Sequence, residues 1–291
     1  MFEDDDEVVV INSDDDEQPE ENESEQEPAE DRYSILQPVI TRVVDALGGY
    51  EKGVYRLGDE ANACLRDLKK LWRKDDDDDE RTVARIFWKT RVFANDLVPI
   101  LLETAGKGML EDKRAISCAD LMTAMTWPID MAEELKELDE DLDKGTDYTQ
   151  LLQSHLHYKS ALLKPGVMQA LFGIIVPPLA KPPKERTERD GQVINVVLHL
   201  IRNMAFIRDL PTNINVSADL QEFSGLQNRL VKALSDTNTI DLLLTIASNA
   251  DNDPLFTTWN TLVLEILYLL FRGVQPSALV EDPAKVRSAL H

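Results

Sequence analysis

Cysteine is scarce in this sequence of 291 residues, which contains Cys64 and Cys118 and no others. Two cysteines exclude a disulfide framework and a four-cysteine zinc site, and they are typical of a reducing compartment. Long apolar runs are lacking too, because no stretch approaches the roughly 18 residues that a transmembrane helix requires. The N-terminus is acidic and has no long apolar core of the secretory-signal type. The sequence therefore predicts a soluble, intracellular protein that does not enter membranes.

Catalytic patterns are also lacking. His155 and His157 are two residues apart, so on a helix they face different directions and cannot hold one metal ion together. His199 lies within the apolar pattern of a helix, which favours a packed or partly exposed side chain. Residues 47–53, LGGYEKG, have the glycines of a phosphate loop but follow a helical pattern and lack its Gly-Lys-Ser/Thr ending, so we interpret them as a helix stop. With no nucleophile paired to a base, we predict no enzyme activity and no cofactor or metal.

Positive charge is in short supply, but only in part of the chain. The formal net charge is −23, and residues 1–34 contain sixteen acidic residues and one arginine. The run Asp75–Glu80 adds six more acids, which leaves the rest of the chain close to neutral. The acidity therefore belongs to a tail and one loop, and it does not exclude a local basic surface for nucleic acid. The tail is too polar to repay its ordering entropy, so we predict that residues 1–33 are disordered.

What the body does contain is helical periodicity, and we find no strand pattern of period two there. Apolar stripes predict helices from about Pro38 to Leu47, from an N-cap at Asp59, from about Val83, over 193–204 and over 255–271. The last of these is apolar on nearly every side, which indicates neighbours all round. One longer connection is predicted in the proline-rich residues 177–192.

About ten helices with mostly short turns favour an all-α fold. The residues HLIRNMAF resemble the last helix of an armadillo repeat, and the helix spacing suits units of about 40–47 residues. We therefore predict an irregular armadillo- or HEAT-like superhelix rather than a bundle. The predicted divisions are a tail at 1–33, a helical domain at 34–280, and a linker or truncated end at 281–291.

Two clusters of cations are candidates for contact with DNA phosphates. They are Lys181, Lys184, Arg186 and Arg189 in the proline-rich connection, and Lys69, Lys70, Arg73 and Lys74 at the end of a helix. The alternative interpretation is structural for both. Acids interrupt the first cluster, and the second is a favourable helix end that precedes the acidic run.

Four consecutive β-branched residues, Val8–Ile11, lie between acidic blocks in the tail. Such residues favour an extended backbone, which can add a strand to an exposed sheet edge. SUMO offers such an edge beside a basic surface, so we predict a SUMO-interacting motif here. Ser13 is followed by three aspartates and is a candidate phosphosite that would add negative charge. The alternatives are a chance run, or packing on the protein's own body.

Four segments together resemble the N-terminal domain of the Timeless family over about residues 35–280. They are CLRDLKKLWRKDDDDDERTVARIFWKTRVFANDLVPILL, DLMTAMTWPI, INVVLHLIRNMAF and LVLEILYLLFRGVQPSAL. The acidic run and the residues 177–192 depart from the family pattern, so no functional residue is transferred to them.

The resemblance implies a nuclear, non-enzymatic scaffold. Family members pair with a small Tipin-type partner in the fork protection complex, which travels with the replicative helicase on fork DNA. That complex stabilises stalled forks and supports the replication checkpoint, DNA repair and chromosome segregation in the cell cycle and in meiosis. Family members are much longer than this chain. The alternative function is a general armadillo-type adaptor for proteins or peptides with no role on DNA.

Overall fold

The computed structural model describes residues 29–78, 80–129, 148–210, 222–251 and 254–275, and within them it confirms the all-α superhelix. The elements are α1 (Ala29–Asp45), β1 (Gly48–Glu51), β2 (Val54–Leu57), α2 (Ala61–Trp72), the 3₁₀-helix η1 (Arg73–Asp75), α3 (Thr82–Thr90), the π-helix η2 (Phe93–Leu97), α4 (Val98–Thr104), α5 (Met109–Met125), α7 (Thr149–Leu162), α8 (Val167–Ala180), α9 (Glu188–Phe206), the 3₁₀-helix η3 (Glu222–Ser224), α11 (Leu226–Asp236), α12 (Thr239–Ser248) and α13 (Pro254–Phe271). Helix α1 begins inside the range 1–33 that composition assigns to the tail.

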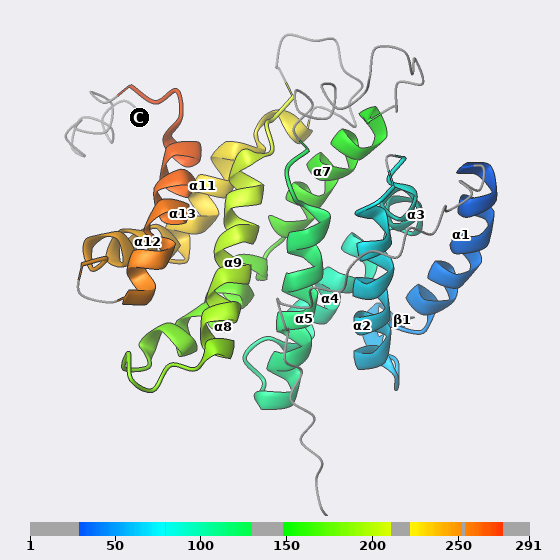
Figure 1. Ribbon diagram of the computed structural model, residues 1–291, viewed down its shortest axis with the longest axis horizontal. Helices are drawn as coiled ribbons and strands as arrows, with labels where there is room; N and C mark the ends of the chain where they lie inside the picture. Colours follow the sequence, from blue (N-terminus) through cyan, green and yellow to red (C-terminus); the bar gives the residue numbers. More distant parts are fainter. Residues whose placement is uncertain (1–28, 79, 130–147, 211–221, 252–253, 276–291) are drawn as a thin grey trace, which may run out of the picture.

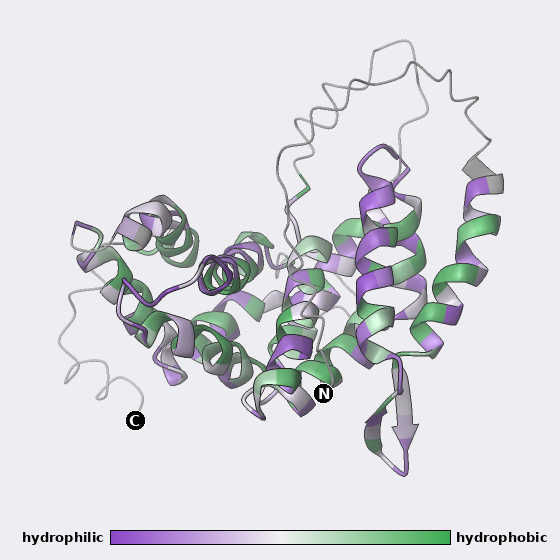
Figure 2. Cartoon of the chain, turned by 60° about the horizontal axis from the view of Figure 1, so that its bottom comes forward, coloured by the Kyte–Doolittle hydropathy of each residue, from purple (hydrophilic) through white to green (hydrophobic). Residues whose placement is uncertain are grey.

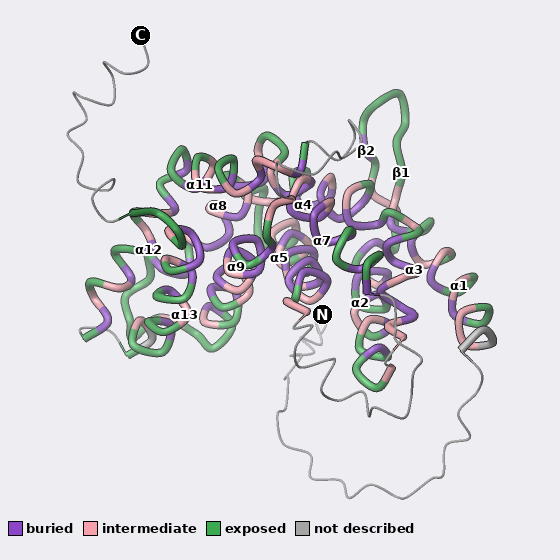
Figure 3. The backbone as a smooth tube through the Cα atoms, turned by 90° about the horizontal axis from the view of Figure 1, so that it is seen from above, coloured by how far each residue is buried: buried purple, intermediate pink, exposed green. Residues whose placement is uncertain are grey.

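The helices form two curved rows (Figures 1 and 3). An inner row consists of α1, α2, α5, α9 and α13, each packed on the next. An outer row covers it, because α3 packs on α1, α4 on α5, α8 on α9, and α12 on α13. The inner row bends so that α5 and α9 are set back between α2 and α13, which makes its free face concave (Figure 3).

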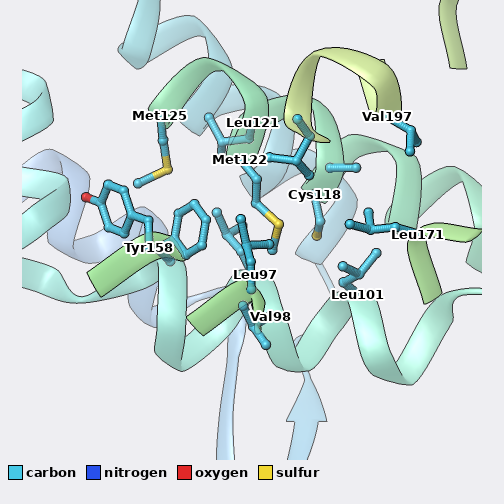
Figure 4. Packing of buried hydrophobic residues seen from close by; sticks show 14 of the residues in the cluster. Leu97, Val98, Leu101, Cys118, Leu121, Met122, Met125, Tyr158, Leu171 and Val197 are labelled. Atoms are coloured by element: carbon cyan, nitrogen blue, oxygen red, sulfur yellow. The ribbon is translucent and has the colours of Figure 1, made fainter. Parts of the chain in front are cut away.

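The core lies between the two rows and is continuous from α1 to α13. Figure 4 shows its middle, where Leu97, Leu101, Met122, Leu171 and Val197 converge from five different elements. Each of these five side chains is at most 2% exposed. Burial of this apolar surface, at roughly 25 cal/mol per Å², holds the rows together.

A β-hairpin corrects the prediction that the body contains no strands. Strands β1 and β2 pair in antiparallel register with Glu51 opposite Val54, and the hairpin projects from the body (Figure 2). Lys52 and Gly53 both have positive φ, as a two-residue hairpin turn of type I′ requires. The predicted helix stop is correct, since α1 ends at Asp45. The strands were missed because each has four residues, too few to show a clear alternation.

The predicted long connection at 177–192 is wrong. Helix α8 continues through Pro177 and Pro178 to Ala180, and α9 already begins at Glu188. Each internal proline removes one helix hydrogen bond. Pro178 and Leu179 are buried against the core, and this packing offsets that loss. The start of α9 is secured by a capping box between Thr187 and Asp190.

Two details of the predicted helices also change. Helix α2 has Glu60, not Asp59, at its N-cap, and no side chain caps it. Helix α13 is not enclosed on all sides, because Leu264 and Tyr268 are 66% and 64% exposed on one face. The opposite face carries Trp259, Val263 and Ile266 into the core, so α13 lies at the edge of the described stack.

The acidic run is only partly the solvated loop that its charge predicts. The carboxylate of Asp75 is buried, and its two oxygens accept hydrogen bonds from the backbone N–H groups of Val83 and Ala84 at 2.8 and 2.7 Å. Asp78 accepts from the N–H of Thr82 at 3.0 Å and pairs with Arg32 at 3.3 Å. Asp75 and Asp78 thus cap α3, and the run is a structural joint between α1, η1 and α3.

Within the described residues, no single helix is long and apolar enough to cross a membrane. Helices α7 and α8 pass that test only as a pair bent by 78°, and both bury most of their apolar side chains in this fold.

Candidate functional site

The concave face of the inner row is crossed by side-chain contacts between neighbouring helices. Between α2 and α5, Arg114 donates to Asn62 at 2.8 Å, and Lys69 is paired with Asp120. From the first contact to the second, the residue number increases in both helices, so α2 and α5 are parallel.

The same arrangement continues to α9 and α13. Trp127, just beyond α5, stacks on His199 of α9 with ring centroids 5.5 Å apart, and the guanidinium of Arg202 lies 4.7 Å from its ring. Arg202 also pairs with Glu265 of α13 at 3.4 Å. Beneath this surface, the buried amide of Asn203 donates to the carbonyl of Thr123 at 3.0 Å. The inner helices α2, α5, α9 and α13 therefore run in one direction, and their C-terminal ends share one edge of the stack. Helix α1 runs the opposite way, because Arg32 at its start contacts Lys74 and Asp78 beyond the end of α2.

A cavity of about 340 Å³ opens at that edge between α2, α5 and α7. Its wall is aromatic and aliphatic, with Trp72, Trp127, Ile129 and Leu151 among the lining residues. Three cations and one acid also line it; they are Lys69, Arg73, Arg81 and Asp76. Trp127 is 49% exposed, so it belongs both to the cavity and to the concave face. The chemistry suits an apolar side chain flanked by negative charge.

His155 forms part of the cavity wall from α7 and is buried. Burial lowers the pKa of its imidazole from 6.5 to about 4, although a hydrogen bond with the backbone of Met125 acts in the opposite direction. Burial raises the pKa of Asp75 and of Asp96 to about 6; the latter accepts a hydrogen bond from Tyr55 at 2.9 Å. These three groups titrate in the acid range for reasons of packing.

His155 is expected to make the fold sensitive to acid. The unfolded chain binds a proton near pH 6.5 and the folded chain only near pH 4, so stability is lost as the pH falls through that window. The full difference is worth about 3 kcal/mol. Asp75 and Asp96 act with the opposite sign between about pH 4 and 6, so the test is a difference between two proteins.

Denaturant unfolding at pH 7 and at pH 4.5 should be compared for the parent chain and His155→Gln, which cannot be protonated. The gap between the two free energies of unfolding should shrink or reverse on acidification. If the difference in free energy of unfolding between the two proteins is the same at both pH values, His155 keeps an ordinary pKa in the folded chain.

The predicted cation cluster of Lys69, Lys70, Arg73 and Lys74 lies at the edge where the cavity opens. Lys69 is engaged by Asp120, whereas Lys70 keeps only a 3.9 Å approach to Asp67 and is 77% exposed. The side chains of Arg73 and Lys74 are exposed on η1. Three of the four cations are therefore free enough to meet an anionic partner.

The predicted cluster of Lys181, Lys184, Arg186 and Arg189 lies at the opposite edge, where α9 begins. Lys181 donates to both oxygens of Asp190 at 2.7 and 2.9 Å, and Arg186 donates to the carbonyl of Leu179 at 2.8 Å. These two cations hold the turn between α8 and α9. Lys184 and Arg189 are exposed. The two clusters are not brought together, and they cannot form one continuous binding surface on the concave face.

Sequence reasoning missed Trp127 and Arg202, because a tryptophan beside a proline and an arginine in an amphipathic helix carry no special signal. Among the described residues, no group of three His, Cys, Asp or Glu side chains is placed to hold an ion. Val8–Ile11, Ser13 and the predicted end segment 281–291 lie outside the described residues.

Comparison with known proteins identifies the family. The family model described as Timeless protein matches residues 54–290, which is most of the chain. The chain belongs to the Timeless family. The match covers the inner row from α2 to α13 and so includes the concave face.

Several relatives of this Timeless-family chain are fungal proteins. It is 41% identical over 269 residues to topoisomerase 1-associated factor 1 of Cryptococcus neoformans, which covers 88% of this chain and 25% of that protein. The mating-type switching protein swi1 of Schizosaccharomyces pombe is 31% identical, over 87% of this chain and 25% of the relative. Topoisomerase 1-associated factor 1 of Aspergillus niger is 33% identical, over 84% and 21%. The chain thus spans about a quarter of the length of these relatives.

Proposed function

We propose that this chain is a non-enzymatic scaffold of the replication fork, acting in the nucleus as the Timeless-type subunit of a fork protection complex. Membership of the Timeless family supports this proposal most directly. The curved inner row supports it physically, because a curved stack of helices offers a long concave surface for partners. Stabilisation of stalled forks, checkpoint signalling, DNA repair and chromosome segregation are the processes such a scaffold would serve.

The proposed partners are a Tipin-type small subunit, the replicative helicase and fork DNA. Of the two cation clusters, we assign the DNA contact to the one at the C-terminal edge, around Arg73. Its cations keep their charge exposed beside exposed aromatic surface at Trp127. The other cluster uses Lys181 and Arg186 to close a turn.

Reversing two charges at the C-terminal edge should weaken DNA binding regardless of sequence. The double variant Arg73→Glu, Lys74→Glu should lose roughly 10- to 100-fold in affinity for forked DNA near 0.1 M salt, and its salt slope should fall by about two. Arg229→Glu, Lys232→Glu on α11 and Lys184→Glu, Arg189→Glu on the α8–α9 turn are matched reversals of exposed cations.

Fluorescence anisotropy across a salt series measures both quantities. Equal losses in all three double variants would indicate a general charge effect without a site. Unchanged affinity and slope in the Arg73 variant would eliminate this surface. If the parent chain shows no salt-dependent binding at all, the alternative function, an armadillo-type adaptor without a DNA role, becomes the better account.

We also propose that Val8–Ile11 binds SUMO as an added strand, with the acids on both sides orienting it on a basic surface. A peptide of residues 1–24 should bind with a dissociation constant in the micromolar range, or roughly −6 to −8 kcal/mol. Phosphate on Ser13 should tighten binding, and Val9→Ala, Val10→Ala, Ile11→Ala should weaken it sharply. NMR titration measures all three peptides, and no shifts at millimolar SUMO would remove this assignment.

A further inference from the structure

We propose that the acidic tail of this chain, residues 1–28, docks on its own concave face. Val8–Ile11 enter the cavity between α2, α5 and α7, and the flanking acids lie against the cations at its rim. This inference stands on the cavity and the tail alone and does not depend on the fork function proposed above.

The cavity has the chemistry to receive such a segment. Its aromatic wall, formed by Trp72 and Trp127, is continuous with Ile129 and Leu151, so an apolar side chain loses contact with water on several sides. The cations Arg73 and Arg81 line it against the single acid Asp76. Lys70 and Lys74 lie on the same helix end and extend the positive surface outward. Acids that flank an apolar segment would lie against this positive surface.

The tail begins beside this cavity. Arg32, in the first turn of α1, donates to the carbonyl of Lys74 at 2.5 Å and pairs with Asp78 at 3.3 Å. The start of α1 is therefore fixed against η1, which carries Arg73 on the cavity wall. The seventeen residues 12–28 can span up to about 55–60 Å when extended, far more than is needed to return Val8–Ile11 to the cavity. A segment tethered by so few residues has an effective concentration of about a millimolar, which favours occupancy even of a weak site.

The tail matches the cavity in composition. Residues 1–28 contain fourteen acids and no lysine or arginine, and apart from Val8–Ile11 their large apolar side chains are Met1 and Phe2. The run Val8–Ile11 lies between Asp4–Glu7 and Asp14–Glu17, so acids reach the rim on both sides of an inserted apolar segment. Docking would cover Arg73 and Lys74. It would also make the full chain a weaker ligand for SUMO than the free tail peptide.

A spin label on the tail tests this contact in the full chain. Cys64 and Cys118 are buried, so a nitroxide can be placed on Ser13→Cys alone. In the ¹⁵N-labelled protein, the indole N–H signals of Trp72 and Trp127 should lose most of their intensity, while that of Trp259, on α13 at the far edge, should not. Signals are assigned by Trp→Phe substitution. Residues 130–147, which follow Ile129, are also acidic. Because the spin label is on the tail, broadening of the tryptophan signals reports the tail and not residues 130–147.

Three controls decide the outcome. Adding Val9→Ser, Val10→Ser and Ile11→Ser should restore the two signals, as should Arg73→Glu in part. If the triple-serine tail broadens the two signals as much as the parent tail does, charge attraction alone accounts for the contact, and Val8–Ile11 do not enter the cavity. No broadening, or equal broadening of Trp259, would overturn docking altogether. A further sample mixes spin-labelled chains that contain no ¹⁵N with ¹⁵N-labelled chains that carry no spin label. Broadening in this mixture would show that a second copy supplies the tail, which also overturns the intramolecular proposal.

Discussion

Replacing Ile266 with Asp is expected to abolish cooperative unfolding of the helical domain. Ile266 is fully buried in α13, and its neighbours in the core are apolar. An aspartate there has no cation to pair with, and burying such a charge costs more than about 4 kcal/mol, a large part of the stability of an ordinary domain. The sequence pattern suggested Leu262 equally well, but that side chain is only partly buried and should tolerate the change better.

The matched control for this variant is Leu264→Asp on the same helix. Leu264 is 66% exposed, so its replacement should move the melting temperature by no more than a few degrees. Thermal unfolding followed by circular dichroism separates the two variants. If Ile266→Asp melts within a degree or two of the parent chain, α13 is not packed in the core as described.

Replacing Lys159 with Met should cost about 3–5 kcal/mol, although a lysine in a helix ordinarily reads as a surface residue. The Lys159 side chain is fully buried, and its ammonium donates to the carbonyl of Ile207 at 2.6 Å, to Gln227 at 2.8 Å and to Asp209 at 3.2 Å. Burial lowers the pKa of Lys159, and the attraction of Asp209 acts against that. Methionine fills a similar volume but removes this donor from the Ile207 carbonyl and the Gln227 side chain, and removes the cation beside Asp209, whose oxygens also accept from the backbone N–H of Gln227.

Lys164→Met, two residues beyond α7 and exposed, is the control and should be nearly neutral. Guanidinium denaturation gives both free energies of unfolding. The loss should also loosen the junction of α7, α11 and α13, because Gln227 bridges to the carbonyl of Leu269 at 3.4 Å. Hydrogen exchange that speeds up across α11 would support this, whereas equal stability of the two variants would show that the buried ammonium contributes nothing.

The helices themselves could be predicted because their signals are local. The apolar stripe of 193–204 and the long apolar segment at 255–271 have lengths and periods that only a helix satisfies, and α9 and α13 follow them closely. Short elements were harder. The strands of the hairpin have four residues each, and Pro177 and Pro178 argued against a helix that tertiary packing nevertheless maintains.

Only part of the candidate site could be predicted from the sequence. Lys70, Arg73 and Lys74 were found as a run of cations, but their partner surface, from Trp127 to Arg202, comes from residues that are far apart along the chain. Lys181 also read as a free cation until the fold placed it on Asp190. Charge clusters show where cations are, whereas the tertiary structure shows which of them are already engaged.

The sequence by itself determined the all-α class, the separation of an acidic tail from a nearly neutral body, and the family, since periodicity, composition and motif order are properties of the chain alone. Only the tertiary structure decided that α2, α5, α9 and α13 run parallel, that Asp75 caps α3, that Lys159 is buried, and that a cavity opens beside Arg73. The physical reason is that burial and pairing depend on which distant segments pack together, and those contacts are set by the summed packing of many helices rather than by any local pattern.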